Sequence, residues 1–123
     1  NRRISPLDRL LALPHTYLRR YDTIVAMGGC PILNTAVDAD DTHPELKRMA
    51  QNIVERISKS LIALIEEGIS IGQIKSETNP NKIAEVMISL VEGGFMMAKL
   101  LDKKEYFESS LEQLNKIITE LRL

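Results

Sequence analysis

The most informative segment is PNKIAEVMISLVEGGFMMAKLL, residues 80–101. If this segment forms a helix, the helix is apolar around most of its circumference. One stripe at spacings of three and four comprises Ile83, Met87, Leu90, Gly94, Met97 and Leu101. A second stripe comprises Ala84, Ile88, Val91, Phe95 and Ala98. The polar strip that remains comprises Glu85, Ser89, Glu92 and Lys99. Such a helix has to be buried on two sides, and a small chain achieves this most economically against a second copy of itself.

The last segment, which follows a polar break at residues 102–104, shows the same excess of apolar surface. Its stripe comprises Phe107, Leu111, Leu114, Ile118 and Leu121, widened by Tyr106 and Ile117. Two such helices per chain, paired about a two-fold axis, would form a four-helix bundle across a homodimer interface. The residues expected at that interface are Leu90, Met97, Leu101, Leu111, Leu114 and Ile118.

Two adjacent glycines, Gly93 and Gly94, interrupt the segment that begins at residue 80. Inside a helix each glycine costs about 1 kcal/mol relative to alanine. Either they allow a neighbouring backbone or a ligand to come close, or the helix simply tolerates them. The sequence supports both interpretations equally.

The beginning of the chain also follows a helical period. Ser5 is a plausible N-cap and Pro6 suits the first helical position. The apolar stripe continues in phase through Pro14, so one kinked helix is predicted rather than two. Gly28 and Gly29 are its expected end.

Between these segments the pattern predicts a short helix at 32–39 and a long one after it. Thr42 and Glu45 match a capping box at the start of the long helix, and Gly72 is its expected end, with Gly68 a weak point inside it. No strand pattern or repeat is found. We therefore predict an all-α fold, with residues 1–123 forming a single helical domain of five to six helices.

Composition excludes several classes of function. The 123 residues are 44% apolar and carry a formal net charge of −1, which gives no overall attraction to nucleic acid or anionic lipid. The longest uncharged run, residues 93–98, is too short to span a membrane. A single cysteine, Cys30, allows no intrachain disulfide and favours a cytoplasmic location. Residue 1 is Asn rather than Met, so a further segment upstream is expected.

Four stretches together resemble the carboxy-terminal domain of TetR-family transcriptional regulators. They are GGCPILN at 28–34, DTHPEL at 41–46, Glu67-Gly68 with Gly72-Gln73-Ile74, and the glycine-containing helix at 90–101. The resemblance extends from about Pro6 to Leu121. It implies a domain that dimerises and holds a small effector, with DNA bound only by an amino-terminal helix-turn-helix. No recognition helix precedes Ser5, so that part is expected to be missing here.

Catalytic and metal-binding interpretations are weaker. Cys30 could pair with His15 or His43, but these lie in different segments and no oxyanion loop is recognisable, so no enzyme is predicted. The acidic run at 38–45 lacks the glycine and glutamate of an EF-hand and the ligands of a zinc site. Acidic residues are common where one helix ends and the next begins, and this explains the run adequately. Neither a metal nor a cofactor is expected.

A sensor pocket is the remaining candidate site. The residues expected to line it are Tyr17, Tyr21, Asn34, Ile53 and Phe95. Tyr17 and Tyr21 lie one turn apart on the kinked helix, and few charged side chains fall on these faces. A small, mainly apolar effector is therefore predicted. The resemblance implies that this effector would release a bacterial repressor from its operator. The alternatives are ordinary core packing at these positions and a dimerisation module without a ligand.

Overall fold

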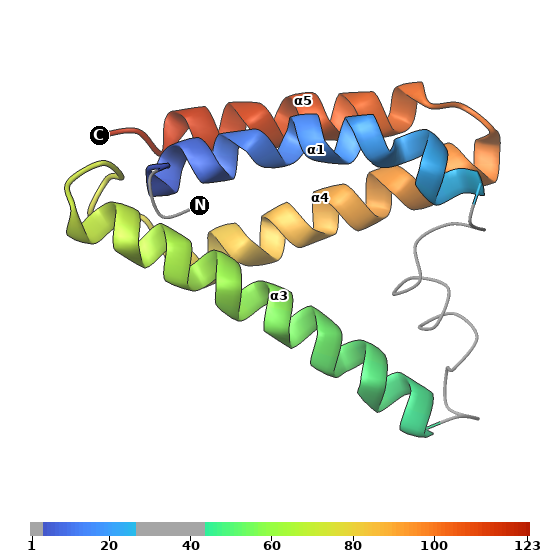
Figure 1. Ribbon diagram of the computed structural model, residues 1–123, viewed down its shortest axis with the longest axis horizontal. Coiled ribbons are helices and arrows are strands. Elements are labelled where there is room, and N and C mark those ends of the chain that lie inside the picture. Colours follow the sequence, from blue (N-terminus) through green and yellow to red (C-terminus); the bar gives the residue numbers. More distant parts are fainter. Residues whose placement is uncertain (1–3, 27–43) are drawn as a thin grey trace.

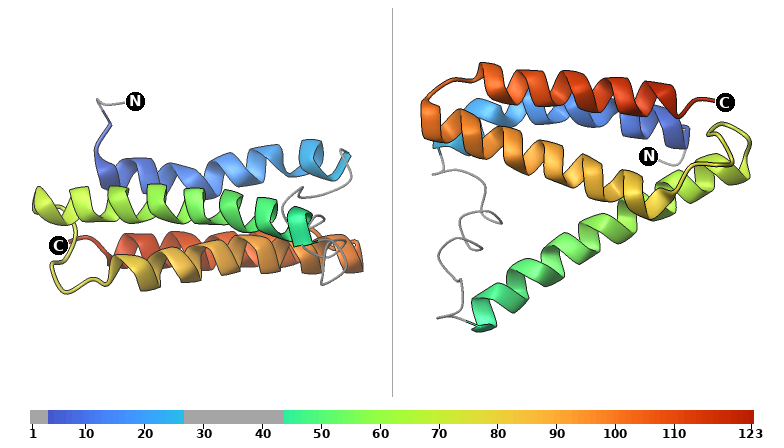
Figure 2. Two further views of the ribbon diagram at one scale, coloured as in Figure 1. Left: turned by 90° about the horizontal axis from the view of Figure 1, so that it is seen from below. Right: turned by 180° about the vertical axis from the view of Figure 1, so that it is seen from behind.

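The computed structural model describes residues 4–26 and 44–123, which form four α-helices (Figure 1). They are α1 (Pro6–Ala26), α3 (Pro44–Ser70), α4 (Pro80–Leu101) and α5 (Glu105–Glu120). Helices α1, α4 and α5 lie alongside one another, whereas α3 diverges from them toward its amino-terminal end (Figures 1 and 2). The all-α prediction is confirmed. The short helix expected at 32–39, together with Cys30 and Asn34, lies outside the described residues.

Helix α1 begins as the sequence predicts. The Asp8 amide donates to the Ser5 Oγ at 3.2 Å, and the Arg9 amide donates to the Ser5 carbonyl at 2.9 Å. The side-chain bond satisfies one of the amides that a helix start leaves without helical partners, and the Arg9 bond is the first hydrogen bond of the helix itself. The helix then continues through Pro14, which confirms the prediction of one helix rather than two.

The end of α3 is a tight turn that brings the chain back over the helix. Gly72 has a φ of 76°, a left-handed conformation that glycine adopts without steric cost, and the Gln73 amide donates to the Gly68 carbonyl at 2.9 Å. This confirms Gly72 as the helix end. A Cβ on Gly68 would collide with the Ile74 side chain, so Gly68 makes room for the buried Ile74.

Helices α4 and α5 approach each other closely at Gly94. A Cβ built there would lie 2.6 Å from the Ser110 Cβ, which is closer than real Cβ atoms come. A Cβ on Gly93 would meet nothing within 4 Å. The close-approach interpretation is therefore confirmed for Gly94, and the neighbour is α5 of the same chain.

The core lies between α1, α4 and α5 and includes three aromatic rings. Tyr21 packs against Phe95 and Phe107 with ring centroids 5.6 and 5.3 Å apart, and Phe95 meets Phe107 edge-on at 5.5 Å. Edge-to-face and tilted pairs of this kind add about 0.5–1.5 kcal/mol each to the burial of the rings. Within residues 4–26 and 44–123, no helix is long and apolar enough to cross a membrane.

The burial of α5 corrects part of the predicted dimer interface. Leu111, Leu114 and Ile118 are 4%, 0% and 0% exposed within a single chain. A side chain without exposed area has none to offer a partner, so these three residues belong to the chain's own core. Leu90 and Met97 are half-buried and Leu101 is 41% exposed, which leaves those three available at the surface.

Candidate ligand pocket and pairing face

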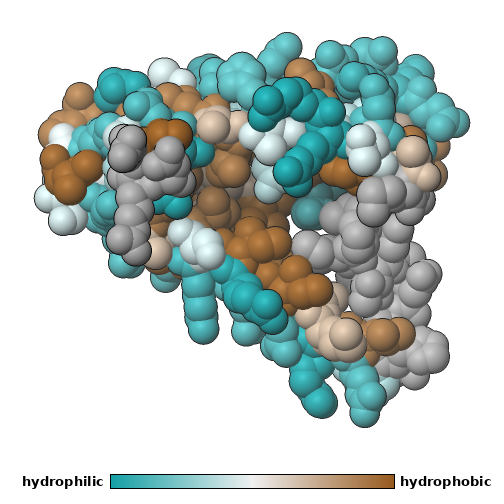
Figure 3. Space-filling view, in the orientation of Figure 1, coloured by the Kyte–Doolittle hydropathy of each residue, from teal (hydrophilic) through white to brown (hydrophobic). Residues whose placement is uncertain are grey.

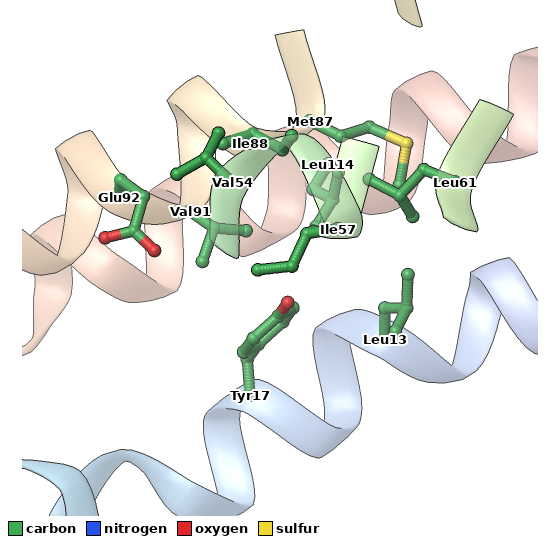
Figure 4. A pocket seen from close by; sticks show the side chains of 10 residues that line it. All are labelled: Leu13, Tyr17, Val54, Ile57, Leu61, Met87, Ile88, Val91, Glu92 and Leu114. Atoms are coloured by element: carbon green, nitrogen blue, oxygen red, sulfur yellow. The ribbon is translucent and has the colours of Figure 1, made fainter. Parts of the chain in front are cut away.

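A small cavity lies where α1, α3 and α4 converge (Figure 4). Leu13 and Tyr17 line it from α1, and Leu114 of α5 closes one side. The other lining residues, from α3 and α4, are Val54, Ile57, Leu61, Met87, Ile88, Val91 and Glu92. The free volume is about 30 Å³, whereas sites for drug-sized ligands typically have at least about 300 Å³. The pocket as it stands holds no more than a water or two.

The walls of this cavity are almost entirely apolar. Eight of the ten lining residues are aliphatic or methionine, and the exceptions are Tyr17 and Glu92. In Figure 4 the Tyr17 hydroxyl points from α1 toward Ile57 of α3, and the Glu92 carboxylate extends from α4. Such a cavity suits an apolar molecule with a polar group at one end.

The structure divides the predicted pocket residues into two groups. Tyr17 lines the cavity, whereas Tyr21 and Phe95 are 8% and 3% exposed and form the aromatic cluster of the core. Their role as ligand-binding residues stays a prediction. Ile53 is 40% exposed and does not line this cavity, whereas its neighbours Val54 and Ile57 do. Asn34 lies outside the described residues.

Sequence reasoning missed Glu92, which it placed on the polar strip of α4. The signal for Ile57 was present, because this residue continues the spacing of four through Ile53 and Leu61. No sequence signal distinguishes a glutamate that faces water from one at the rim of an apolar cavity. The orientation of α4 against α1 and α3 decides where Glu92 lies, and that orientation is known only from the structure.

Helix α3 is the loosely held wall of the pocket. Over its first twenty residues, 44–63, Ala50 is the one fully buried residue. Leu46, Met49 and Ile53 are 41%, 59% and 40% exposed, and Figure 3 shows apolar side chains along α3 on the side turned toward α4. Helices with few buried contacts are the first to move when a ligand needs space.

Tyr21 is electrostatically distinct from the other side chains of the cluster. Burial raises the pKa of its hydroxyl, and the negative charges of Asp22, Asp102 and Glu105 raise the pKa further. The Lys104 Nζ lies 5.3 Å from the centre of the ring, where its positive charge is attracted to the ring face. Tyr21 therefore stays neutral and acts as a packing residue.

A second surface feature lies on the outer side of α4 and α5. A shallow groove of about 320 Å³ runs over Leu90, Gly93, Met96, Met97 and Tyr106. Met96, Tyr106 and the neighbouring Leu100 are 42%, 42% and 72% exposed. We call this surface, residues 90–101 of α4 with Tyr106 of α5, the pairing face. Methionine, leucine and tyrosine exposed together are typical of a surface that another protein covers.

A metal centre finds no support in the described part of the chain. No group of three or more His, Cys, Asp or Glu side chains comes together among residues 4–26 and 44–123. Most of the acidic run at 38–45, the weak metal-site candidate in the sequence, lies outside those residues.

Comparison with known proteins places the fold in a class of helical regulators. It is similar to a TetR transcriptional regulator from Chloroflexus aurantiacus, with a TM-score of 0.90 and 29% identity. It is also similar to a TetR-family regulator from Cytophaga hutchinsonii, with a TM-score of 0.85 and 30% identity. Each match covers 98% of this chain but only 61% and 60% of the regulator. A search of curated proteins found no match.

The family follows from a direct match to its model. Residues 6–114 match the model described as "Tetracyclin repressor-like, C-terminal domain". The chain belongs to this family, as its sequence motifs predicted. The family consists of transcriptional regulators and not of enzymes, which confirms the prediction that the chain is not an enzyme.

Proposed function

We propose that this domain is the ligand-sensing and dimerisation part of a bacterial, cytoplasmic repressor. A small apolar molecule enters between α1, α3 and α4, and a second copy of the chain covers the pairing face. Ligand binding then moves DNA-binding heads that precede the domain in the whole protein, so that they leave the operator. The observation that carries the proposal is an apolar cavity walled on one side by the weakly packed α3.

The small volume sets a condition on this function. A ligand of ordinary size needs about ten times the present 30 Å³, so α3 has to move away from α1 and α4. The ligand must then bind the opened state more tightly than the closed state, and couplings of about 1–3 kcal/mol are typical of such sensors.

Thermal shift with a broad set of small apolar compounds tests the sensing function. A true ligand stabilises the domain by an amount that grows with concentration, about 2.7 kcal/mol at a hundred times its Kd. The variant Ile57→Trp fills the cavity and is expected to abolish the shift. Ile71→Trp, at a 59% exposed position after α3, is the matched control that keeps it. A shift that survives in Ile57→Trp would place the ligand elsewhere.

Light scattering tests the pairing. The pairing face predicts a homodimer at micromolar concentration, and Leu100→Glu is expected to make the chain monomeric because a charge would be buried in the interface. Ile71→Glu introduces the same charge at another exposed apolar position and should stay dimeric. A monomer mass for the unmodified chain would contradict the proposal.

A dimerisation module without a ligand is the second candidate. The observation that favours it is the nearly closed cavity, because a purely structural domain needs no larger space. It predicts a dimer by light scattering and no thermal shift with any compound of the set.

A further inference from the structure

The apolar stripe of α3 continues beyond the pocket. Ile57 lines the cavity, and the same helix face carries Ile53, Met49 and Leu46 toward the amino-terminal end of α3. These three side chains are 40%, 59% and 41% exposed, and α3 diverges from α4 in the same direction (Figure 1). Exposed apolar side chains that adjoin one another are typical of a binding surface. The stripe is therefore an apolar surface that is continuous with the pocket.

The polar side chains of the pocket are already engaged within the chain. Eight of the ten lining residues are aliphatic or methionine, and the other two, Tyr17 and Glu92, each interact with another residue. A ligand that needed a hydrogen bond or a counter-ion here would have to compete with those interactions. A hydrocarbon leaves both in place. Recognition in this pocket therefore depends on apolar contact and on shape.

We infer that the effector carries a long, unbranched hydrocarbon chain, whose end enters the pocket while the rest lies along the stripe of α3. The inference rests on the proposed sensing function and goes further, because it names the class of effector. A narrow cavity that leads onto a long stripe suits a linear chain better than a compact ring system. From Ile57 to Leu46 the helix rises about 16 Å, which is the length of about a dozen methylene groups.

The length of the hydrocarbon chain then sets the affinity. Each methylene group that leaves water for an apolar surface strengthens binding by up to about fourfold, for as long as the stripe offers surface. The probes 1-hexanol, 1-octanol, 1-decanol and 1-dodecanol share one polar group and differ only in length. In titration calorimetry of the intact chain we expect the Kd to fall at each step, by about a hundredfold over the series.

One substitution tests whether the hydrocarbon chain lies on α3. Ile53→Ser removes apolar contact one turn beyond Ile57, so 1-dodecanol should bind at least about fivefold more weakly. The Kd of 1-hexanol, which the pocket itself holds, should stay the same. Ile71→Ser makes the same change at a 59% exposed position after α3 and should leave both affinities unchanged. Circular dichroism and light scattering of both variants check that the helices and the oligomeric state are intact.

The outcomes separate this inference from the function on which it rests. Equal affinity for all four alcohols, or a rise with length that Ile53→Ser leaves intact, would overturn the placement on α3 and leave a compact sensor pocket. If Ile53→Ser made the chain monomeric, the stripe would be a contact between copies, which also overturns the inference. Failure of the alcohols to bind, when another compound of the broad set does, would overturn the inference alone. No binding of any compound would overturn both.

Discussion

Helices α5 and α3 are both amphipathic, but the chain holds them very differently. The 16-residue α5 buries Phe107, Leu111, Leu114 and Ile118, whereas the 27-residue α3 buries only Ala50, Ile65 and Gly68. The stability of the fold therefore resides in α1, α4 and α5, together with the carboxy-terminal end of α3. The rest of α3 is a wall that can yield. A sensor needs both parts, because a ligand must reshape its pocket without unfolding the scaffold.

Truncation of one large side chain in each region is expected to give the largest contrast. Phe107→Ala removes a 1% exposed ring that contacts Tyr21 and Phe95, and a loss of about 3–5 kcal/mol in the free energy of unfolding is expected. Ile53→Ala, at a 40% exposed position of α3, should cost less than about 1 kcal/mol. Urea denaturation monitored by circular dichroism measures both. Equal losses would show that α3 is packed as firmly as α5.

The two glycines of α4 give a smaller and more local contrast. Gly94→Ala forces a Cβ against Ser110 of α5, so a loss of about 1–3 kcal/mol is expected despite the better helix propensity of alanine. Gly93→Ala meets nothing within 4 Å and should gain up to about 1 kcal/mol. The double variant Gly94→Ala with Ser110→Gly should recover most of the loss. If it does not, the close approach of α4 and α5 is not the cause.

The sequence predicted more about the individual elements than about how their faces are used. The helix cap at Ser5 and the helix end at Gly72 depend on local chemistry, and the structure has both. Orientation depends on packing. In α4 the buried residues come from both predicted stripes, because the buried face lies between them. Leu90 and Met97 therefore lie half-buried at the edge of the buried face, and Glu92 lies at the pocket. Periodicity could not predict this orientation, because both stripes are apolar.

A hydrogen bond at the carboxy-terminal end of α3 tests how its firmly held end is fixed. The Leu7 amide, at the start of α1, donates to the Gln73 Oε1 at 2.9 Å, and the Leu123 amide donates to the Gln73 carbonyl at 3.1 Å. Gln73→Ala leaves the Leu7 amide without its acceptor, and a loss of about 1–2 kcal/mol is expected. Gln113→Ala, at an exposed position of α5, is the matched control and should have almost no effect. Similar losses for both variants would assign no special role to this contact.

The smallest effect concerns pH and belongs to the aromatic cluster alone. Burial, followed by the charges of Asp22, Asp102 and Glu105, raises the pKa of Tyr21 above its ordinary value of 10.0. The folded state therefore keeps the proton where the unfolded chain releases it. The stability that Tyr21 contributes is fully present below about pH 10 and is lost as the pH rises through the folded pKa. Tyr21→Phe should flatten this decline in urea denaturation between about pH 9 and 11, because phenylalanine has no proton to lose. If the decline in Tyr21→Phe matched that of the unmodified chain, the hydroxyl of Tyr21 would be open to water, and the cluster would be less tightly closed than the ring distances indicate.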